Sequence, residues 1–371
     1  MASTTNMNGN VSFLGKLWIF LTFLRFPPVL LYNLTLTRSS ERNKNKSVAR
    51  VIGDSATRWV TGHLDAIQVQ HYFGTSPKTY KAFLKETKMP EITDELEGGG
   101  RLLWVGPKEV DRVLLYCHGG GFVTCLADFH LHYCLHLKNE LESRLDGKRV
   151  GVAVLEYSLA PDFPFPTQLK QLVAAVNLLF SNGVKPENLH LIGDSAGANL
   201  VVQLLSHTLH PLPSVPASPL QGSQSKLGGV YLMSPWASLL GDFPSAKVNA
   251  NTEWVTQDLS ISMGKMVLAR VPEEQRAYLE IAKAPKDWFN GVNQLVNRVL
   301  VTLGEKECLS DPIIILIEAL KQYHPSVQVA IEPHGVHNDI LQDFFVKEKK
   351  LNTIARAVDD WLEAGYKASV V

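Results

Sequence analysis

The sequence predicts an α/β protein built around a mostly parallel, doubly wound sheet with a helical cap. From about residue 101 onward, short apolar runs rich in β-branched residues alternate with stretches of helical periodicity. Several of these runs are apolar throughout, as expected for strands buried on both faces of a parallel sheet. The chain has 371 residues, 45% of them hydrophobic and 19% charged, which suits one large core with an appended or inserted segment.

The alternation locates the elements in order along the chain. We expect strands at residues 101–105, 113–117, 150–157, 189–193, 229–233, 298–303 and 327–332. We expect helices at residues 129–145, 167–181, 196–207, 312–323 and 340–362. Strands that alternate with helices in this way are typical of a parallel sheet joined by helical crossovers.

Two segments do not follow the alternation. One is residues 1–100, which end in three glycines, and the other is about residues 239–290. Segments in these positions commonly cover the site at the edge of such a sheet. We therefore predict an N-terminal hydrophobic anchor or cap segment at residues 1–100, and an α/β domain at residues 101–371 with a cap insertion at about 239–290.

An apolar stretch at residues 13–36 is long enough to span a bilayer, although Lys16, Arg25 and two prolines interrupt it. A signal peptide fits less well, because positive charge should precede its apolar run. Here the basic cluster follows the apolar run, which favours a cytoplasmic location for the rest of the chain. Two interpretations stay open: a membrane anchor or interfacial helix, or a soluble cap helix that covers an apolar pocket.

Charge and cysteine content exclude no class of function, but they weaken the case for nucleic-acid binding, redox chemistry and zinc binding. Lys plus Arg and Asp plus Glu both number 36, so nothing suggests a nucleic-acid partner. The four cysteines form no C-x-x-C pair, which weakens redox and zinc-ribbon interpretations. His130, His132, Cys134 and His136 have helical spacing, but histidines at a surface or pocket are commoner than a metal site.

A G-D-S-A-G sequence at residues 193–197 lies between a predicted strand and a predicted helix. This is the pattern of a nucleophile elbow, in which a tight turn needs glycine at both flanking positions. The turn would hold Ser195 above the carboxyl end of the sheet. The N-terminus of the following helix favours negative charge there. We therefore predict Ser195 as a nucleophile.

A second motif, H-G-G-G-F at residues 118–122, follows the predicted strand 113–117. Successive glycines let backbone N–H groups point into one cavity. We expect Gly119, Gly120 and Ala196 to form an oxyanion hole, in which each donor contributes about 3–4 kcal/mol to stabilising a tetrahedral intermediate. We interpret His118 as a structural anchor of this loop.

A base and an acid are predicted beyond the last two strands. His337 follows the strand at 327–332 and is our choice as general base, with His334 as the competitor. After the strand at 298–303 we choose Glu307 as the acid that orients the imidazole, with Asp311 second and Glu305 third. The order serine, acid, histidine is that of α/β hydrolases.

Together the two glycine-containing motifs make the chain resemble the hormone-sensitive-lipase-like family of α/β hydrolases. The block at residues 156–166 is also similar to that family's Y-R-L-A-P-E-x-x-F-P segment, with Ser158 in place of the usual arginine. Glu307 replaces the usual aspartate, as in fungal steryl-acetyl hydrolases, which also carry an N-terminal hydrophobic segment. The resemblance implies an α/β-hydrolase catalytic domain at residues 101–371. It also implies a membrane-associated enzyme, at the endoplasmic reticulum, with a cytoplasmic enzyme as the alternative.

The combined motifs predict a serine carboxylic-ester hydrolase with a Ser195–His337–Glu307 triad and no metal or organic cofactor. The resemblance implies deacetylation of a lipophilic, sterol-like or secondary-metabolite acetate ester. Bulky side chains predicted near the site also favour a small acyl group: Phe122, Phe163, Phe165, Trp236 and Trp254. The alternatives are an amidase such as an aryl formamidase on the same triad, or a non-catalytic ligand receptor on the same scaffold.

Overall fold

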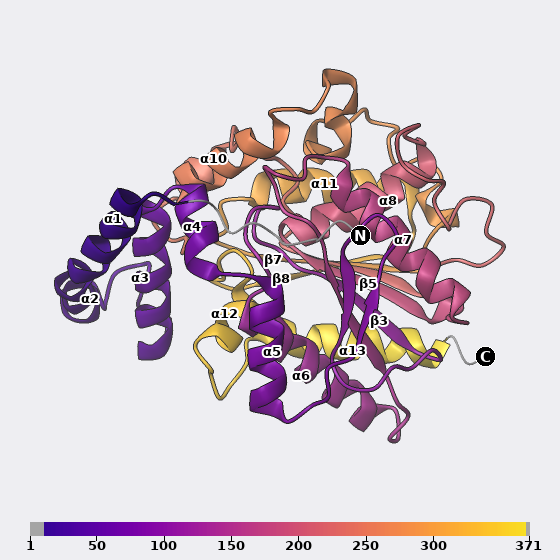
Figure 1. The fold of residues 1–371 in the computed structure, drawn as a ribbon, viewed down its shortest axis with the longest axis horizontal. Helices are drawn as coiled ribbons and strands as arrows, with labels where there is room; N and C mark the ends of the chain where they lie inside the picture. The colour runs from indigo at the N-terminus through magenta and orange to yellow at the C-terminus, as the bar shows by residue number, and fades with distance from the viewer. Residues whose placement is uncertain (1–10, 369–371) are drawn as a thin grey trace.

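An eight-stranded sheet lies at the centre of the protein in a computed structural model, which describes residues 11–368. The strand order is β1-β2-β4-β3-β5-β6-β7-β8. The strands from β4 to β8 in this order are parallel, and only β1 and β2 at one edge pair antiparallel. The predicted mostly parallel, doubly wound sheet is therefore confirmed (Figure 1).

The strands are β1 Thr93–Glu95, β2 Arg101–Trp104, β3 Val113–Cys117, β4 Gly151–Glu156, β5 Leu189–Asp194, β6 Gly229–Met233, β7 Val299–Gly304 and β8 Val327–Glu332. The first seven α-helices are α1 Phe13–Leu24, α2 Phe26–Thr35, α3 Val48–His63, α4 Ala66–Phe73, α5 Ser76–Thr87, α6 Asp128–Arg144 and α7 Thr167–Ser181. The remaining α-helices are α8 Ala196–Leu209, α9 Pro244–Val248, α10 Gln257–Leu268, α11 Ser310–Tyr323, α12 Asp339–Phe345 and α13 Thr353–Ala368. Short 3₁₀ helices lie at Pro186–Asn188, Glu273–Tyr278, Ile281–Lys283 and Val292–Gln294.

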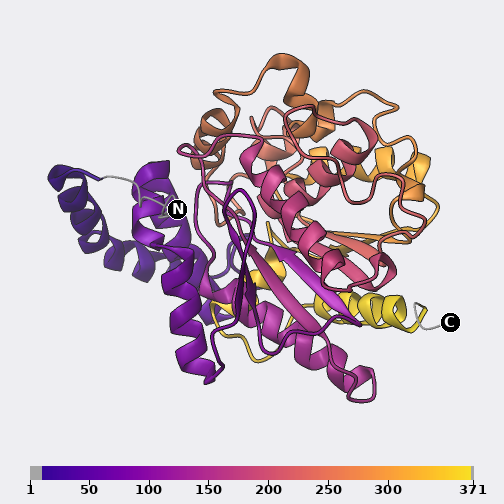
Figure 2. The same cartoon turned by 45° about the vertical axis from the view of Figure 1, so that its right-hand side comes forward.

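The sheet has an apolar core on each face. In β3, Leu114 and Tyr116 belong to one core and Leu115 and Cys117 to the other, as the two-residue period of a strand requires. Helices α5, α6, α12 and α13 cover one face, and α7, α8 and α11 cover the other (Figures 1 and 2). Burial on both faces explains why these strands are apolar throughout.

Each predicted strand is present, with ends within one residue of those expected. The prediction of one helix at residues 340–362 is wrong, because α12 and α13 are separate helices. The chain turns between them, with Lys347 in the left-handed region at φ 55°. This break lets α12 pack against α3 and α6 while α13 packs against α6, β7 and β8. A straight helix could not reach all of these elements.

Residues 11–100 form five helices and the short strand β1. The segment Phe13–Thr35, which holds α1 and α2, is long and apolar enough to cross a membrane, and few of its residues are buried. Its exposed large apolar side chains are those of Phe13, Leu14, Leu17, Trp18, Phe20, Leu24, Leu31 and Tyr32. Helices α3 and α4 instead pack against α10 of residues 239–290, beside the body of the fold (Figure 2).

Candidate active site

The turn between β5 and α8 places Ser195 at the carboxyl end of a central strand. Ser195 has φ 52° and ψ −115°, a conformation that non-glycine residues rarely adopt. The flanking glycines are required by space. A Cβ on Gly193 would lie 2.4 Å from the backbone of Gly197, and one on Gly197 would lie 1.9 Å from the Cys117 carbonyl oxygen. The tight turn expected from the sequence is therefore present.

Ser195, His337 and Glu307 form one hydrogen-bonded chain. The Ser195 Oγ lies 2.9 Å from His337 Nε2, and His337 Nδ1 lies 2.6 Å from Glu307 Oε1. With the ring proton on Nδ1, the imidazole donates to the carboxylate and its Nε2 accepts from the serine hydroxyl. All three side chains are buried, Glu307 completely.

The second carboxylate oxygen of Glu307 is also held. It accepts hydrogen bonds from Ser234 Oγ at 2.9 Å and from the Gly304 N–H at 3.0 Å. The carboxylate is therefore fixed by the ends of β6 and β7, so that one oxygen faces His337.

The competing residues lie elsewhere. Asp311 Oδ2 accepts from the Ser245 N–H at 2.8 Å, at the start of α9. Glu305 Oε2 accepts from the His334 N–H at 2.8 Å, and both of these side chains are largely exposed. The structure thus brings Glu307 and His337 to Ser195, and does not bring Asp311, Glu305 or His334 there.

The environment of His337 makes it more basic than an ordinary histidine. Burial alone would lower the pKa of His337, but the Glu307 carboxylate and its hydrogen bond raise it, and the net pKa is raised. A base that gains proton affinity from a buried carboxylate can take the serine proton and stay charged during the reaction.

The glycine loop requires a correction to the predicted oxyanion donors. The Gly119 N–H donates to Asp194 Oδ1 at 2.7 Å and is not free for an oxyanion. Gly119 has no side chain because a Cβ would lie 2.2 Å from Asp194 Oδ2. The next two residues, Gly120 and Gly121, have φ of 103° and 62° and line the cavity beside Ser195.

Asp194 was not singled out in the sequence, although it lies inside the G-D-S-A-G motif. Its oxygens accept hydrogen bonds from Tyr116 Oη at 2.6 Å and Asn338 Nδ2 at 2.9 Å, as well as from Gly119. Burial alone would raise the pKa of Asp194, but His130, Tyr116 and Gly119 lower it overall. The buried carboxylate therefore ties the glycine loop, the elbow and the residue after His337 together.

His118 has the structural place that the sequence suggested. Its ring is buried, stacks on Tyr157 at 4.2 Å between centroids and places Nδ1 2.7 Å from the Gly119 carbonyl oxygen. Burial lowers the pKa of His118 to about 3. The ring is therefore neutral at physiological pH and packs under the glycine loop.

A cavity of about 170 Å³ opens beside Ser195. Its wall is contributed by α3, α4, α10, α12, the glycine loop and residues 253–261. Trp236 and Trp254 line it, as the sequence suggested, whereas Phe122 and Phe165 line a separate, smaller cavity. Because α3 and α4 form part of the wall, the N-terminal segment shapes the site even though α1 and α2 lie outside it.

The helical histidines do not converge on one point. His132 Nε2 lies 3.4 Å from Asp128 Oδ2 and 3.7 Å from Glu86 Oε2, near the surface. The Cys134 thiol is instead buried, and burial raises its pKa well above the usual value. Burial likewise raises the pKa of the Cys308 thiol, so a reactive cysteine beside the acid is not supported.

Comparison with known proteins identifies a fold family and several relatives. Residues 114–341 match a family model described as alpha/beta hydrolase fold. The chain is 35% identical over 141 residues to an acetyl-hydrolase of Streptomyces hygroscopicus, covering 37% of this chain and 40% of that protein. It is 28% identical over 291 residues to human hormone-sensitive lipase, covering 72% and 25%. It is 29% identical over 187 residues to rabbit (Oryctolagus cuniculus) arylacetamide deacetylase, covering 45% and 44%. The matches therefore span less than half of the length of these relatives.

Solved structures agree on the fold. An esterase/lipase from an uncultured bacterium superposes with a TM-score of 0.59 at 19% identity, covering 92% of this chain and 98% of that one. An esterase from the bacterial hormone-sensitive lipase family gives 0.60 at 21% identity, covering 87% and 98%. At these identities the likeness concerns the fold.

Proposed function

The chain belongs to the alpha/beta hydrolase fold family, and from this premise we propose that it is a serine carboxylic-ester hydrolase. The predicted resemblance to hormone-sensitive-lipase-like hydrolases is confirmed by the same family and by the relatives it matches. The single observation that carries the proposal is the hydrogen-bonded chain from Ser195 through His337 to Glu307.

The proposed reaction has two acyl-transfer steps. His337 takes the Ser195 proton as Oγ attacks the ester carbonyl carbon, and then returns that proton to the leaving alcohol. Water, activated by the same imidazole, attacks the acyl-enzyme and releases the acid and the free serine. Glu307 holds the ring orientation and stabilises the imidazolium in both steps.

The N–H groups of Gly120, Gly121 and Ala196 are the proposed oxyanion donors. Both glycines line the cavity, and Ala196 is the first residue of α8, where backbone N–H groups have no partner within the helix. Donors fixed in advance at the developing charge stabilise the transition state by about 3–4 kcal/mol each.

We propose an acetate ester of a lipophilic alcohol as substrate. The names acetyl-hydrolase and arylacetamide deacetylase among the relatives support removal of an acetyl group. At the glycine loop, a Cβ on Gly121 would lie 2.7 Å from Met263 Sδ, so little room is left beside the oxyanion donors. The name arylacetamide deacetylase also favours the amidase alternative, which matched aryl acetate and acetanilide substrates would distinguish.

Membrane association through residues 13–36 is the second part of the proposal. The exposed apolar side chains of α1 and α2 support it, and exposed Lys16 and Arg25 are available to lipid headgroups. The proposed location is the endoplasmic-reticulum membrane, where a lipophilic ester would be dissolved, with a cytoplasmic enzyme as the alternative.

Fluorophosphonate labelling tests the nucleophile. The wild-type protein should be labelled and should hydrolyse p-nitrophenyl acetate, whereas Ser195→Ala should lose both properties and keep its circular dichroism spectrum. Labelling of Ser195→Ala equal to that of the wild type would exclude Ser195. A ligand receptor on the same scaffold would show no turnover in either protein.

A further inference from the structure

Residues 249–254 of the cap insertion, here called the strap, hold the loop that carries the proposed acid. Asn249 Nδ2 donates to the Glu307 carbonyl oxygen at 2.9 Å. Thr252 Oγ1 donates to the Lys306 carbonyl oxygen at 3.0 Å. Two side chains of the strap therefore hold two consecutive backbone carbonyl groups, those of Lys306 and Glu307.

The next two residues of the strap hold the proposed base. Glu253 Oε1 accepts from the His337 N–H at 2.9 Å, and Trp254 Nε1 donates to the His337 carbonyl oxygen at 2.6 Å. The indole also lies nearly parallel to the imidazole, with an interplanar angle of 22° and 6.3 Å between centroids. Both backbone polar groups of His337 are thus bound by consecutive residues.

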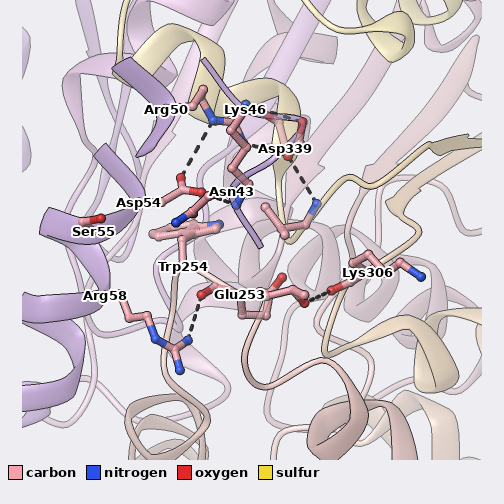
Figure 3. Close-up of polar contacts among 12 residues, drawn as sticks. Asn43, Lys46, Arg50, Asp54, Ser55, Arg58, Glu253, Trp254, Lys306 and Asp339 are labelled. Carbon is pink, nitrogen blue, oxygen red and sulfur yellow. Dashed lines mark hydrogen bonds and ion pairs between the residues drawn. The ribbon is translucent and has the colours of Figure 1, made fainter. Parts of the chain in front are cut away.

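Helix α3 anchors the strap from the other side. Arg58 Nη1 donates to the carbonyl oxygens of Ala250 at 2.9 Å and Glu253 at 2.8 Å, as Figure 3 shows for Glu253. Thr256 just beyond the strap forms two hydrogen bonds with Thr61, at 3.3 and 2.7 Å. The strap is therefore held between α3 and the two loops of the proposed triad.

The same helix holds the loop of His337 directly. Arg50, with 6% of its surface exposed, pairs with Asp339 at 2.8 Å and Asp343 at 2.7 Å. Asp339 in turn accepts from the Val336 N–H at 3.2 Å. Figure 3 shows Arg50 and Arg58 along one helix, facing Asp339 and the strap. Buried ion pairs recover their desolvation cost only in good geometry, so this network favours one position of the loop.

We propose that Glu253 is a positioning residue, which sets His337 at its hydrogen-bonding distance from Glu307 with α3 as its support. This inference rests on the proposed triad. Burying a carboxyl group costs free energy unless it has a specific hydrogen-bond partner. An apolar side chain would therefore fill this position at lower cost if packing were its only role. Glu253 is 2% exposed and is used as an acceptor by the backbone of the proposed base itself.

The charges around Glu253 agree with an acceptor role at neutral pH. Burial and the Glu307 charge raise the pKa of Glu253 to about 8, although His337 and Lys46 act in the opposite direction. The raised pKa favours the neutral acid, which still accepts through its carbonyl oxygen. A glutamine at this position keeps a carbonyl acceptor of the same length, whereas leucine removes it.

The cap offers a matched control for a buried glutamate. Glu280 is 4% exposed and accepts from the Leu239 N–H at 2.9 Å and from Ser238 Oγ at 3.0 Å. It is a buried acceptor for a backbone N–H of the same cap insertion, but its partners are Ser238, Leu239 and Lys283. Glu280→Leu therefore removes the same kind of hydrogen bond without removing one to His337.

The experiment compares Glu253→Leu, Glu253→Gln and Glu280→Leu by proton NMR of the full chain. A proton on His337 Nδ1 bound to the Glu307 carboxylate gives a far-downfield resonance, which Glu307→Gln should remove and so assign. We expect Glu253→Leu to lose or shift this resonance, and Glu253→Gln and Glu280→Leu to keep it. An unchanged resonance in folded Glu253→Leu, or equal loss in folded Glu280→Leu, overturns the inference. Because this readout needs no turnover, it stands even if the ester-hydrolase proposal fails.

Kinetics on p-nitrophenyl acetate supply the second readout. Misplacement of a catalytic group by about 1 Å costs about 100-fold, so Glu253→Leu should lower kcat about 10- to 100-fold with KM within about threefold. Glu253→Gln should recover kcat to within about fivefold of the wild type. Equal losses in Glu253→Gln and Glu253→Leu would overturn the acceptor role. Inactivity of the wild type itself would instead overturn the proposed function.

Discussion

At the scale of single residues, the site depends on how closely backbones approach one another. The strained conformation of Ser195 costs about 1–3 kcal/mol and persists because Gly193 and Gly197 let β3, β5 and α8 meet without side chains between them. A similarly close approach lets the Gly119 N–H donate to Asp194, while Gly120 and Gly121 line the cavity. The three consecutive glycines therefore have two roles: Gly119 binds Asp194, and Gly120 and Gly121 line the cavity.

The acidic loop provides the first prediction at this scale. Glu307→Gln should lower kcat about 10³- to 10⁴-fold, because an amide can no longer favour the proton on His337 Nδ1 or stabilise the imidazolium. Asp311→Asn should lower it less than about tenfold, since the asparagine oxygen can still accept from the Ser245 N–H. Steady-state kinetics of the two purified variants checks the order, and a larger loss in Asp311→Asn would transfer the acid role to Asp311.

The pH dependence of activity follows from His337. Its neutral form is the proposed base, so kcat/KM should fall as pH drops through the raised pKa of His337, and the midpoint should lie above the ordinary histidine value of about 6.5. Removing the Glu307 charge lowers that pKa, so the acid limb of the residual activity in Glu307→Gln should move to lower pH. A pH–rate profile of both proteins measures the shift, and an unmoved limb would mean that another group controls it.

At the scale of elements, the N-terminal helices divide into two pairs with different surroundings. Helices α1 and α2 leave large apolar side chains exposed, although Trp59 of α3 still donates to the Thr22 carbonyl oxygen. Helices α3 and α4 line the cavity, and α3 carries the ion pairs of Arg50. The membrane-anchor interpretation of the N-terminal segment is therefore supported by α1 and α2. The cap interpretation is supported by α3 and α4.

Truncation should separate the two pairs. Deleting residues 1–36 should release the protein from membranes into the soluble fraction with esterase activity within about threefold of the full chain, because Arg50 and Arg58 remain. Deleting residues 1–63 removes the support of the strap and part of the cavity wall, and should abolish activity. Sedimentation of lysates followed by an ester assay of both fractions measures this. Full-length protein that is already soluble without detergent would exclude the anchor.

At the scale of the whole molecule, the cavity lies where four parts of the chain meet. The carboxyl end of the sheet supplies Ser195, the C-terminal loops supply Glu307 and His337, and the cap and the helices α3 and α4 close the sides. Parallel strands direct their carboxyl ends to one edge, which is why residues 142 apart in sequence share a hydrogen bond. The walls of this cavity therefore come largely from elements outside the sheet.

Acyl-chain length provides the prediction at this scale. Met263 lies against Gly121 and Trp236 lines the cavity, which leaves little room beside Gly121, where we propose that the acyl group binds. One methylene is worth about 1–3 kcal/mol, so kcat/KM should fall steadily from acetate to hexanoate esters of one alcohol. An ester series with p-nitrophenol, followed by sterol acetates, measures the trend. A maximum at octanoate or longer would remove the acetyl-hydrolase proposal.

Local sequence patterns were enough to predict strands β2 to β8 and the strand-to-helix turn of the elbow. Local signals suffice for these, because apolar runs reveal strands buried on both faces and the glycines around Ser195 reveal a tight turn. His337 and Glu307 were chosen from their positions after strands and from the family resemblance, and the structure brings both side chains to Ser195.

Which groups face one another depends on how distant elements pack, and this could not be predicted from local patterns. The choice between Gly119 and Gly121 depends on where Asp194 points, and the split between α12 and α13 depends on the surfaces that each helix must cover. The role inferred for Glu253 had no local signal, because its partner His337 lies 84 residues away in sequence. Hydrogen bonds across such separations arise from packing of whole elements, and no short pattern in a single chain encodes them.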